Sequence, residues 1–204
     1  MRLYLVIGNN VDLKKFPFDG DIIAIDKGAK RLMEAGISFQ YAVGDFDSIG
    51  DKKLLKKLSE DAKCLKLNPI KDDTDTYHAL SLFYDKYQEI YIVGGISGAR
   101  QEHFIANLKL FYHFPKIKLI DDNSVISLVE NGATFTRDQY TYYSFFALEN
   151  VTSLTLRGFK YAIQNFDLKI ESALCISNEL KDEVGYVSFK SGSLLLIKSR
   201  EDNK

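Results

Sequence analysis

Short apolar runs alternate with helix-periodic segments over the first part of the chain. The apolar runs are Leu3–Ile7, Ile22–Ile25, Tyr41–Val43, Cys64–Leu67, Ile90–Val93 and Ile117–Ile120. The helix-periodic segments between them are Lys27–Ala35, Asp51–Glu60, Thr74–Tyr87 and Gln101–Phe114. Continuous apolar runs of this length are typical of strands buried on both faces. Their alternation with helices predicts a mostly parallel, Rossmann-like sheet with right-handed crossover connections.

The pattern changes after residues 121–123, where strand-like runs follow one another with turn residues between them. These runs are rich in Thr, Tyr, Phe, Val and Leu: Ser124–Glu130, Tyr140–Ala147, Val151–Leu156, Asp167–Ile176, Tyr186–Phe189 and Ser193–Lys198. Such spacing favours an all-β antiparallel sandwich, with Ser191-Gly192 as a hairpin turn between the last two strands. We therefore expect an α/β domain over residues 1–122 and a β-sandwich domain over residues 123–204.

Composition narrows the class of protein. The 204 residues are 46% hydrophobic and 13% aromatic, which excludes general disorder. A formal net charge of −1 gives no basic field for nucleic acid or for an anionic membrane. Cys64 and Cys175 lack the spacing of a metal site, and the apolar run Leu3–Ile7 is too short for a signal peptide or a spanning helix. We expect a cytoplasmic protein with reduced cysteines.

Polar, acidic and glycine residues follow nearly every predicted strand of the first domain. The segments are Asn9-Asn10, Asp26-Lys27-Gly28, Gly44–Ser48, Lys71–Asp75, Gly94–Gly98 and Asp121-Asp122. In open parallel sheets, ligands bind in the crevice beyond the carboxyl ends of the strands. Convergence of so many polar loops at one edge predicts a binding site there.

Two groups of carboxylates stand at these strand exits. Asp45 and Asp47, two positions apart, offer hard oxygen ligands suited to Mg²⁺, although Asp47 or Ser48 is equally suited to cap the following helix. A second group, Asp72, Asp73 and Asp75, opens the next helix, where acidic residues are favoured by the helix dipole alone. Three carboxylates exceed the needs of one cap, however, and they would repel one another without a divalent cation.

The glycine-rich segment Gly94–Arg100 lies between a strand and a helix. Glycines let the backbone approach a phosphate, and the first amides of a helix attract anions. Arg100 is suited to clamp phosphate oxygens and Lys71 to add a second positive charge. His103 follows three positions later and is suited either to the same crevice or to helix packing. The order of residues matches neither the dinucleotide fingerprint nor the Walker loop.

Together these loops indicate nucleotide-dependent phosphoryl or pyrophosphoryl transfer, and their combination resembles the thiamine pyrophosphokinase family. Members of that family carry Asp-Gly-Gly-Ala, Gly-Asp-x-Asp-Ser, Lys-Asp-x-Thr-Asp, and a Gly-Arg-x-Asp-His stretch followed by Leu-Ala-Asn. The corresponding segments here are Asp26–Ala29, Gly44–Ser48, Lys71–Asp75, Gly95–His103 and Ile105–Asn107. Near the C-terminus, Ser177-Asn178-Glu179 is similar to the family's Ser-Asn-Glu segment. The resemblance covers nearly the whole chain.

The resemblance implies transfer of a pyrophosphoryl group from ATP to the hydroxyl of thiamine, with Mg²⁺ as cofactor, in a homodimer with its sites at the subunit interface. It implies in-line attack on the β-phosphorus with AMP as the leaving group. The implied metal ligands are Asp45, Asp47, Asp72 and Asp75, and the implied catalytic residues are Asp45, Asp47, Asp73 and Arg100. The implied ATP-binding residues are Asp26, Gly28, Ser48, Lys71, Thr74, Gly95, Gly98, His103 and Asn107. Ser177 and Asn178 are expected to bind thiamine.

Three positions depart from the family pattern. Lys27 replaces the second glycine of the first motif, Ala99 replaces a glycine, and Glu102 replaces an aspartate. The chain also contains no tryptophan, so any stacking on thiamine must come from another residue.

Two other functions fit the acidic and glycine loops. The first is a kinase or pyrophosphokinase for a different small alcohol, against which only Ser177-Asn178-Glu179 speaks. The second is an inactive nucleotide-binding module, which the changes at Lys27 and Ala99 would permit. An assay with ATP, Mg²⁺ and thiamine separates all three.

Overall fold

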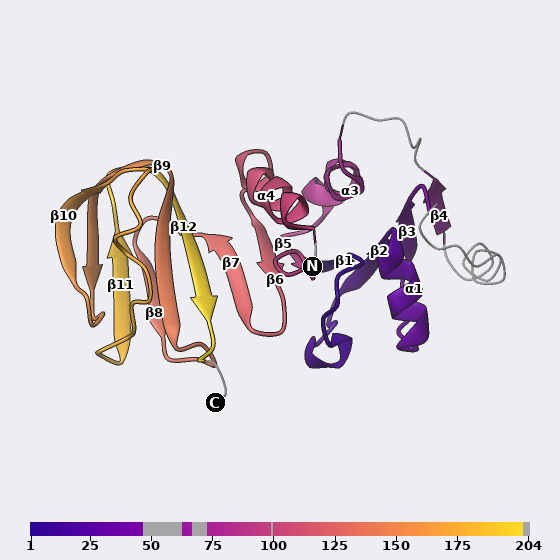
Figure 1. Ribbon diagram of the computed structural model, residues 1–204, viewed down its shortest axis with the longest axis horizontal. Helices are drawn as coiled ribbons and strands as arrows, with labels where there is room; N and C mark the ends of the chain where they lie inside the picture. Colours follow the sequence, from indigo (N-terminus) through magenta and orange to yellow (C-terminus); the bar gives the residue numbers. More distant parts are fainter. Residues whose placement is uncertain (47–62, 67–72, 99, 202–204) are drawn as a thin grey trace. The chain divides into compact units, whose positions relative to one another are not determined.

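The computed structural model describes residues 1–46, 63–66, 73–98 and 100–201. It divides into two compact units, Met1–Asp122 and Asn123–Lys204 (Figure 1). The predicted helix Asp51–Glu60 and the candidate residues Asp47, Ser48, Lys71 and Asp72 lie outside the described residues, as does Ala99. No helix in the described ranges is long and apolar enough to cross a membrane.

The first unit is built on a parallel sheet. Its strands are β1 (Arg2–Val6), β2 (Asp21–Ile25), β3 (Tyr41–Gly44), β4 (Lys63–Lys66), β5 (Glu89–Val93) and β6 (Ile117–Ile120). Their order is β4-β3-β2-β1-β5-β6, and every neighbouring pair is parallel. From β1 the chain continues to β2, β3 and β4 on one side of the sheet, and from β5 it continues to β6 on the other side. The direction of the connections therefore reverses between β1 and β5. The prediction of a parallel sheet from alternating apolar runs is confirmed for these strands.

Helices cover both faces of this sheet. Figure 1 shows α1 (Lys27–Glu34) on one face, and α3 (Asp75–Phe83) and α4 (Gln101–Lys109) on the other. Thr74 caps α3, because its Oγ1 accepts a hydrogen bond from the backbone N–H of Tyr77 at 3.2 Å. The predicted helix Thr74–Tyr87 is shorter than expected. It passes through a 3₁₀ turn at Tyr84–Lys86, and Tyr87 is already extended.

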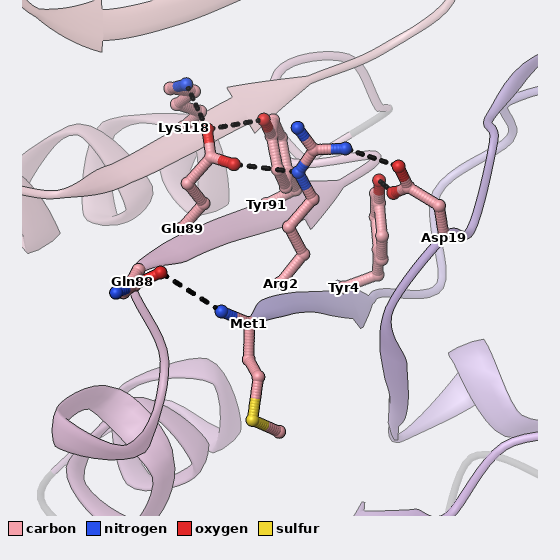
Figure 2. Close-up of polar contacts among 8 residues, drawn as sticks. All are labelled: Met1, Arg2, Tyr4, Asp19, Gln88, Glu89, Tyr91 and Lys118. Carbon is pink, nitrogen blue, oxygen red and sulfur yellow. Dashed lines mark hydrogen bonds and ion pairs between the residues drawn. The ribbon is translucent and has the colours of Figure 1, made fainter.

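A polar and aromatic network joins β1, β5 and β6 across one face of the sheet (Figure 2). Parallel register places Arg2 beside Glu89, and Arg2 Nε donates to Glu89 Oε2 at 2.7 Å. Lys118 Nζ and the Tyr91 hydroxyl donate to the other oxygen of Glu89, each at 3.1 Å. The Tyr4 ring stacks on Tyr91 with a centroid distance of 5.1 Å. One carboxylate therefore ties together three strands that are far apart in the sequence.

Asp19 extends the network at its other end. Its carboxylate accepts a hydrogen bond from the Tyr4 hydroxyl at 2.6 Å and pairs with Arg2. The segment that precedes β2, after the 3₁₀ turn Leu13–Lys15, is thereby fastened to β1 (Figure 2).

The second unit is antiparallel throughout its described pairings. Its strands are β7 (Ser124–Leu128), β8 (Ala133–Thr136), β9 (Tyr142–Arg157), β10 (Ile163–Leu168), β11 (Val184–Ser188) and β12 (Ser191–Ser199). The order is β7-β12-β9-β11-β8, with β10 also paired to β9. Strand β9 is shared: its first part pairs with β12 and its last residues with β11. Buried Tyr143, Phe145, Leu154, Phe159 and Leu196 belong to one core on its inner side.

Several predicted boundaries in this unit are wrong. Most of the predicted run Tyr140–Ala147, from Tyr142 on, and all of Val151–Leu156 belong to the single strand β9. The polar residues between the two runs, Glu149 and Asn150, are exposed within this strand. Strand β8 was not predicted, and β10 begins earlier than the expected run Asp167–Ile176 and ends at Leu168.

The predicted hairpin at Ser191-Gly192 is also wrong. β11 and β12 do not pair with each other; each pairs with a different part of β9. Gly192 lies inside β12 with φ of +100°, and a Cβ atom there would be 2.3 Å from the carbonyl oxygen of Asn150. The glycine therefore permits close approach to β9 at a register shift and does not form a turn.

The network around Glu89 predicts a pH-dependent contribution to stability. Hydrogen bonding from Arg2, followed by that from Lys118, lowers the pKa of Glu89 from its ordinary 4.5 to about 2. Because the folded value is depressed, the stabilisation is complete above the ordinary pKa and disappears as the pH falls toward the folded one. The contribution is at most about 1 kcal/mol, since the pairs are partly exposed.

We expect Glu89→Gln to lower the free energy of unfolding at pH 7, and this difference from wild type to shrink between about pH 5 and pH 2. Urea titrations across this range measure the difference. Glu34→Gln is the control, because Glu34 makes only an exposed contact with Lys30 at 3.8 Å. A difference that is equally large at pH 7 and pH 2.5 contradicts the prediction.

Candidate active site

A pocket of about 440 Å³ opens at the carboxyl edge of the parallel sheet. It lies where the connections change direction, because its walls include the residues after β1 and those at the starts of α1, α3 and α4. Open parallel sheets bind their ligands at this kind of position. The lining residues used below are Gly8, Asn9, Asp26, Lys27, Thr74, Asp75, Arg100, His103 and Asn107.

Asp26 follows the end of β2 and has a strained backbone conformation. Its φ is +51°, a conformation that non-glycine residues seldom adopt outside functional sites and turns. Its N–H donates to the carbonyl of Val43 at 3.0 Å, and its Oδ1 accepts from the N–H of Phe46 at 3.4 Å. Gly44 makes room for this carboxylate, since a Cβ atom there would be 2.6 Å from Asp26 Oδ1. Asp26 thus links the C-terminal ends of β2 and β3 through hydrogen bonds.

Two asparagine side chains fix the glycine-rich loop after β5. Asn9 Nδ2 donates to the carbonyl of Gly94 at 2.6 Å, and Asn107 Nδ2 donates to that of Gly95 at 2.9 Å. Asn107 is buried, and Asn9 packs so closely on Gly98 that a Cβ atom there would be 2.7 Å from its Oδ1. The loop is thus held from β1 on one side and from α4 on the other, which presets its shape before any ligand binds.

The acidic side of the pocket comes from Asp26 and from the first turn of α3. The cap formed by Thr74 places Asp75 and Thr76 at the pocket wall. The amides of this first turn lack partners within the helix and carry the positive end of its dipole. Two carboxylates and a helix N-terminus therefore face the same space.

The basic side comes from Lys27, Arg100 and His103. Arg100 Nε donates to Glu102 Oε1 at 2.7 Å, and this contact lowers the pKa of Glu102. The Arg100 side chain remains 72% exposed, so it is still accessible to a ligand. The pocket thus combines carboxylates with cations, an arrangement suited to a metal–polyphosphate ligand.

The pocket brings together six of the eleven candidate residues that the structure describes in the first unit. Those lining the pocket are Asp26, Thr74, Asp75, Arg100, His103 and Asn107. Those that are described but do not line it are Gly28, Asp45, Asp73, Gly95 and Gly98. Gly28 instead lets α1 approach β1, because a Cβ atom there would be 1.9 Å from the carbonyl oxygen of Val6.

Within the described ranges, no three His, Cys, Asp or Glu side chains gather closely enough to hold a metal ion. Asp26 and Asp75 alone offer carboxylates to the pocket among its lining residues. One or two carboxylates suit Mg²⁺ that is bound mainly through substrate phosphates and water.

Asn9 and Lys27 line the pocket but were not among the candidate residues. Asn9 stood at a predicted strand exit, which was a signal for its location. The sequence did not indicate the role of Asn9, because its hydrogen-bond partner Gly94 is 85 positions away.

In the second unit, Asn178 is a structural anchor. Only 1% of it is exposed. Its Oδ1 accepts from the N–H groups of Tyr161 and Glu179 at 2.9 and 3.0 Å, and its Nδ2 donates to the carbonyl of Tyr161 at 3.0 Å. Its backbone also pairs with that of Tyr143 in both directions. These hydrogen bonds give the Asn178 side chain a structural role, and the expectation that Asn178 binds thiamine stays a prediction.

Ser177 next to it is exposed and has φ of +51°. Its N–H donates to Ser144 Oγ at 2.9 Å. Asn178 therefore holds a strained segment that presents Ser177 and the half-buried Glu179 at the surface of this unit.

Comparisons with known proteins agree over nearly the whole chain. The sequence profile "Thiamin pyrophosphokinase, catalytic domain" matches residues 20–120, and "Thiamin pyrophosphokinase, vitamin B1 binding domain" matches residues 133–194. Thiamine pyrophosphokinase of Bacillus subtilis (strain 168) is 37% identical over 187 residues, covering 88% of this chain and 87% of the relative.

Solved structures give the same result. The Bacillus subtilis thiamine pyrophosphokinase structure superposes with a TM-score of 0.89 at 32% identity, covering 98% of this chain and all of the other. The corresponding protein of Geobacillus thermodenitrificans gives a TM-score of 0.88 at 30% identity, covering 100% of this chain and 99% of the other.

Removing the Asn107 side chain should destabilise the first unit. In Asn107→Ala the buried carbonyl of Gly95 loses its donor, which costs about 1–3 kcal/mol. Gln101→Ala is the matched control, since Gln101 Nε2 donates to the carbonyl of Gly98 at 3.0 Å but is exposed. Chemical denaturation of both variants measures the two costs, and equal effects would contradict the assigned role of the buried bond.

We expect replacement of Asn178 and replacement of its neighbour Ser177 to change the stability of the second unit by different amounts. Asn178→Ala removes three part-buried hydrogen bonds, and we expect a loss of about 2–3 kcal/mol. Ser177→Ala should change stability by less than about 0.5 kcal/mol, because the side chain is exposed. Thermal unfolding followed by circular dichroism tests both; a fully stable Asn178→Ala variant would show that the anchor is dispensable.

Proposed function

The chain belongs to the thiamine pyrophosphokinase family of transferases, and we propose that it transfers the pyrophosphoryl group of ATP to the hydroxyl of thiamine. The products are thiamine diphosphate and AMP. The observation that carries this proposal is the pocket at the change of strand direction, whose lining includes the carboxylates of Asp26 and Asp75 and the cations Lys27 and Arg100. A metal-bound polyphosphate matches both signs of charge, because carboxylates suit the metal and cations suit the phosphates.

ATP is proposed to bind along this wall. Arg100 and His103 face the phosphates from α4, and the first turn of α3 adds its amides. The loop Gly94–Gly98 gives backbone support, and the bonds from Asn9 and Asn107 keep it in place. Lys71 and Ser48 belong to the proposed ATP site by their motifs, as do Gly28, Gly95 and Gly98.

Mg²⁺ is proposed as the cofactor, with Asp75 as the ligand that the described pocket offers. Asp45, Asp47 and Asp72 belong to the proposed ligand set by their motifs, and the carboxylate chemistry of this set suits the ion. When bound, Mg²⁺ neutralises charge on the phosphate oxygens.

The proposed reaction is an in-line displacement. A bond forms between the thiamine hydroxyl oxygen and the β-phosphorus, while the bond from this phosphorus to the α,β-bridging oxygen breaks and AMP departs. The hydroxyl proton passes to a carboxylate, for which Asp73 and Asp47 are the candidates. The chain's own contribution is to position the reactants and to hold fixed charges around the phosphates.

Thiamine is proposed to bind to the second unit through Ser177, with Asn178 as the residue that positions it. We further propose a homodimer, in which residues 123–204 serve thiamine binding and dimerisation. The supporting observations are the match to a vitamin B1 binding domain and the exposed segment that Asn178 holds. A cytoplasmic location is proposed because Cys64 and Cys175, both described, are thiols that form no disulfide.

Incubation of the full chain with ATP, Mg²⁺ and thiamine tests the function directly. We expect AMP and thiamine diphosphate in equal amounts, measured by chromatography. AMP that appears only with another alcohol would instead favour a different pyrophosphokinase. Binding of ATP without any turnover would indicate an inactive nucleotide-binding module.

Asp75→Asn tests the proposed metal ligand. Loss of one carboxylate should lower kcat/KM by at least about a hundredfold and raise the Mg²⁺ concentration needed for half-maximal activity. The helix cap at Thr74 is kept, so stability should change little. Asp85→Asn, an exposed change in the same segment of the chain, is the control. Unchanged Mg²⁺ dependence in Asp75→Asn would remove Asp75 from the metal site.

A further inference from the structure

Lys27 is one of the cations that line the pocket. It is the first residue of α1 and follows the strained Asp26 at the end of β2. Among the described residues its ammonium group has no ion pair or hydrogen bond. In the same wall Arg100 is paired with Glu102. Lys27 is therefore the cation of this wall whose charge is not already offset by a described carboxylate.

The Lys27 side chain packs against Gly8, two residues after the end of β1. A Cβ atom built on Gly8 would be 2.6 Å from Lys27 Cβ and 3.5 Å from both Cγ and Cδ. The methylene stem thus lies along the backbone at residue 8, which also lines the pocket. A larger residue at position 8 would displace the stem, so the glycine and the lysine are matched to each other.

The position suits a phosphate ligand. Lysine carries a compact charge on a flexible stem and binds phosphate as a point charge. The N-terminus of α1 adds the positive end of a helix dipole at the same place. This chain therefore places a lysine side chain and a helix N-terminus together at the proposed nucleotide wall.

We propose that the ammonium group of Lys27 binds the phosphate chain of the nucleotide and contributes to the affinity for ATP over nucleosides. This inference rests on the proposed function, since it assigns ATP to the same pocket. It adds a residue that determines nucleotide affinity in this chain.

Titration calorimetry of the full chain with Mg-ATP and with adenosine tests the proposal. The variants are Lys27→Ala and Lys27→Arg, and Lys30→Ala is the matched control from the same helix, where Lys30 contacts Glu34 outside the pocket. We expect Lys27→Ala to weaken ATP binding about tenfold and to leave adenosine binding unchanged. Lys27→Arg should recover most of the affinity, and Lys30→Ala should match wild type.

Steady-state kinetics gives a second measurement. In Lys27→Ala the KM for ATP should rise about tenfold, while the KM for thiamine stays the same. Wild-type affinity for ATP in Lys27→Ala overturns the role of Lys27 and leaves the proposed function standing. Equal weakening of ATP and adenosine overturns it as well, because a merely structural role would affect both ligands. Wild-type protein that binds no ATP overturns the proposed function and this inference together.

Discussion

The pairing of β1 with both β2 and β5 is the constraint on which the first unit depends. Leu3, Leu5 and Val6 of β1 are fully buried between these neighbours. Because the crossovers leave β1 and β5 in opposite directions, the loops after their paired carboxyl ends diverge and leave a crevice. Gly28 allows α1 to close on the end of β1, and the glycine loop after β5 faces it. The pocket is thus a consequence of strand order, and its chemistry comes from the loops that this order brings together.

Asparagine amides hold these loops in place. Asn9 and Asn107 donate to carbonyls of the glycine loop, and Asn178 ties its own segment to Tyr161 in the second unit. A glycine-rich loop is favourable for approach to phosphate but costs conformational entropy when it is ordered. Side-chain bonds from more rigid strands and helices supply that order in advance. Positioning of this kind is the main contribution a protein makes to phosphoryl transfer.

Charged groups of both signs line the pocket. Asp26 and Asp75 face the pocket together with Lys27 and Arg100, and Glu102 restrains the last of these from outside the wall. The network around Glu89 uses the same kinds of groups for a different purpose, because there every charge is paired across strands (Figure 2). Paired charges stabilise the sheet slightly, whereas charges left facing a pocket are suited to bind a ligand.

The sequence alone determined the buried parallel strands and the residues that follow them, because apolar runs and polar strand exits are local patterns. Asp26, Asp75 and Arg100 were found in this way. Tertiary structure decided what depends on distant partners: the bond from Asn9 to Gly94, the burial of Asn178, and the sharing of β9 between β11 and β12. A hairpin at Gly192 was the natural local interpretation, yet the glycine serves a contact with Asn150. Pairing between remote segments leaves no periodic signal, so only the folded chain shows it.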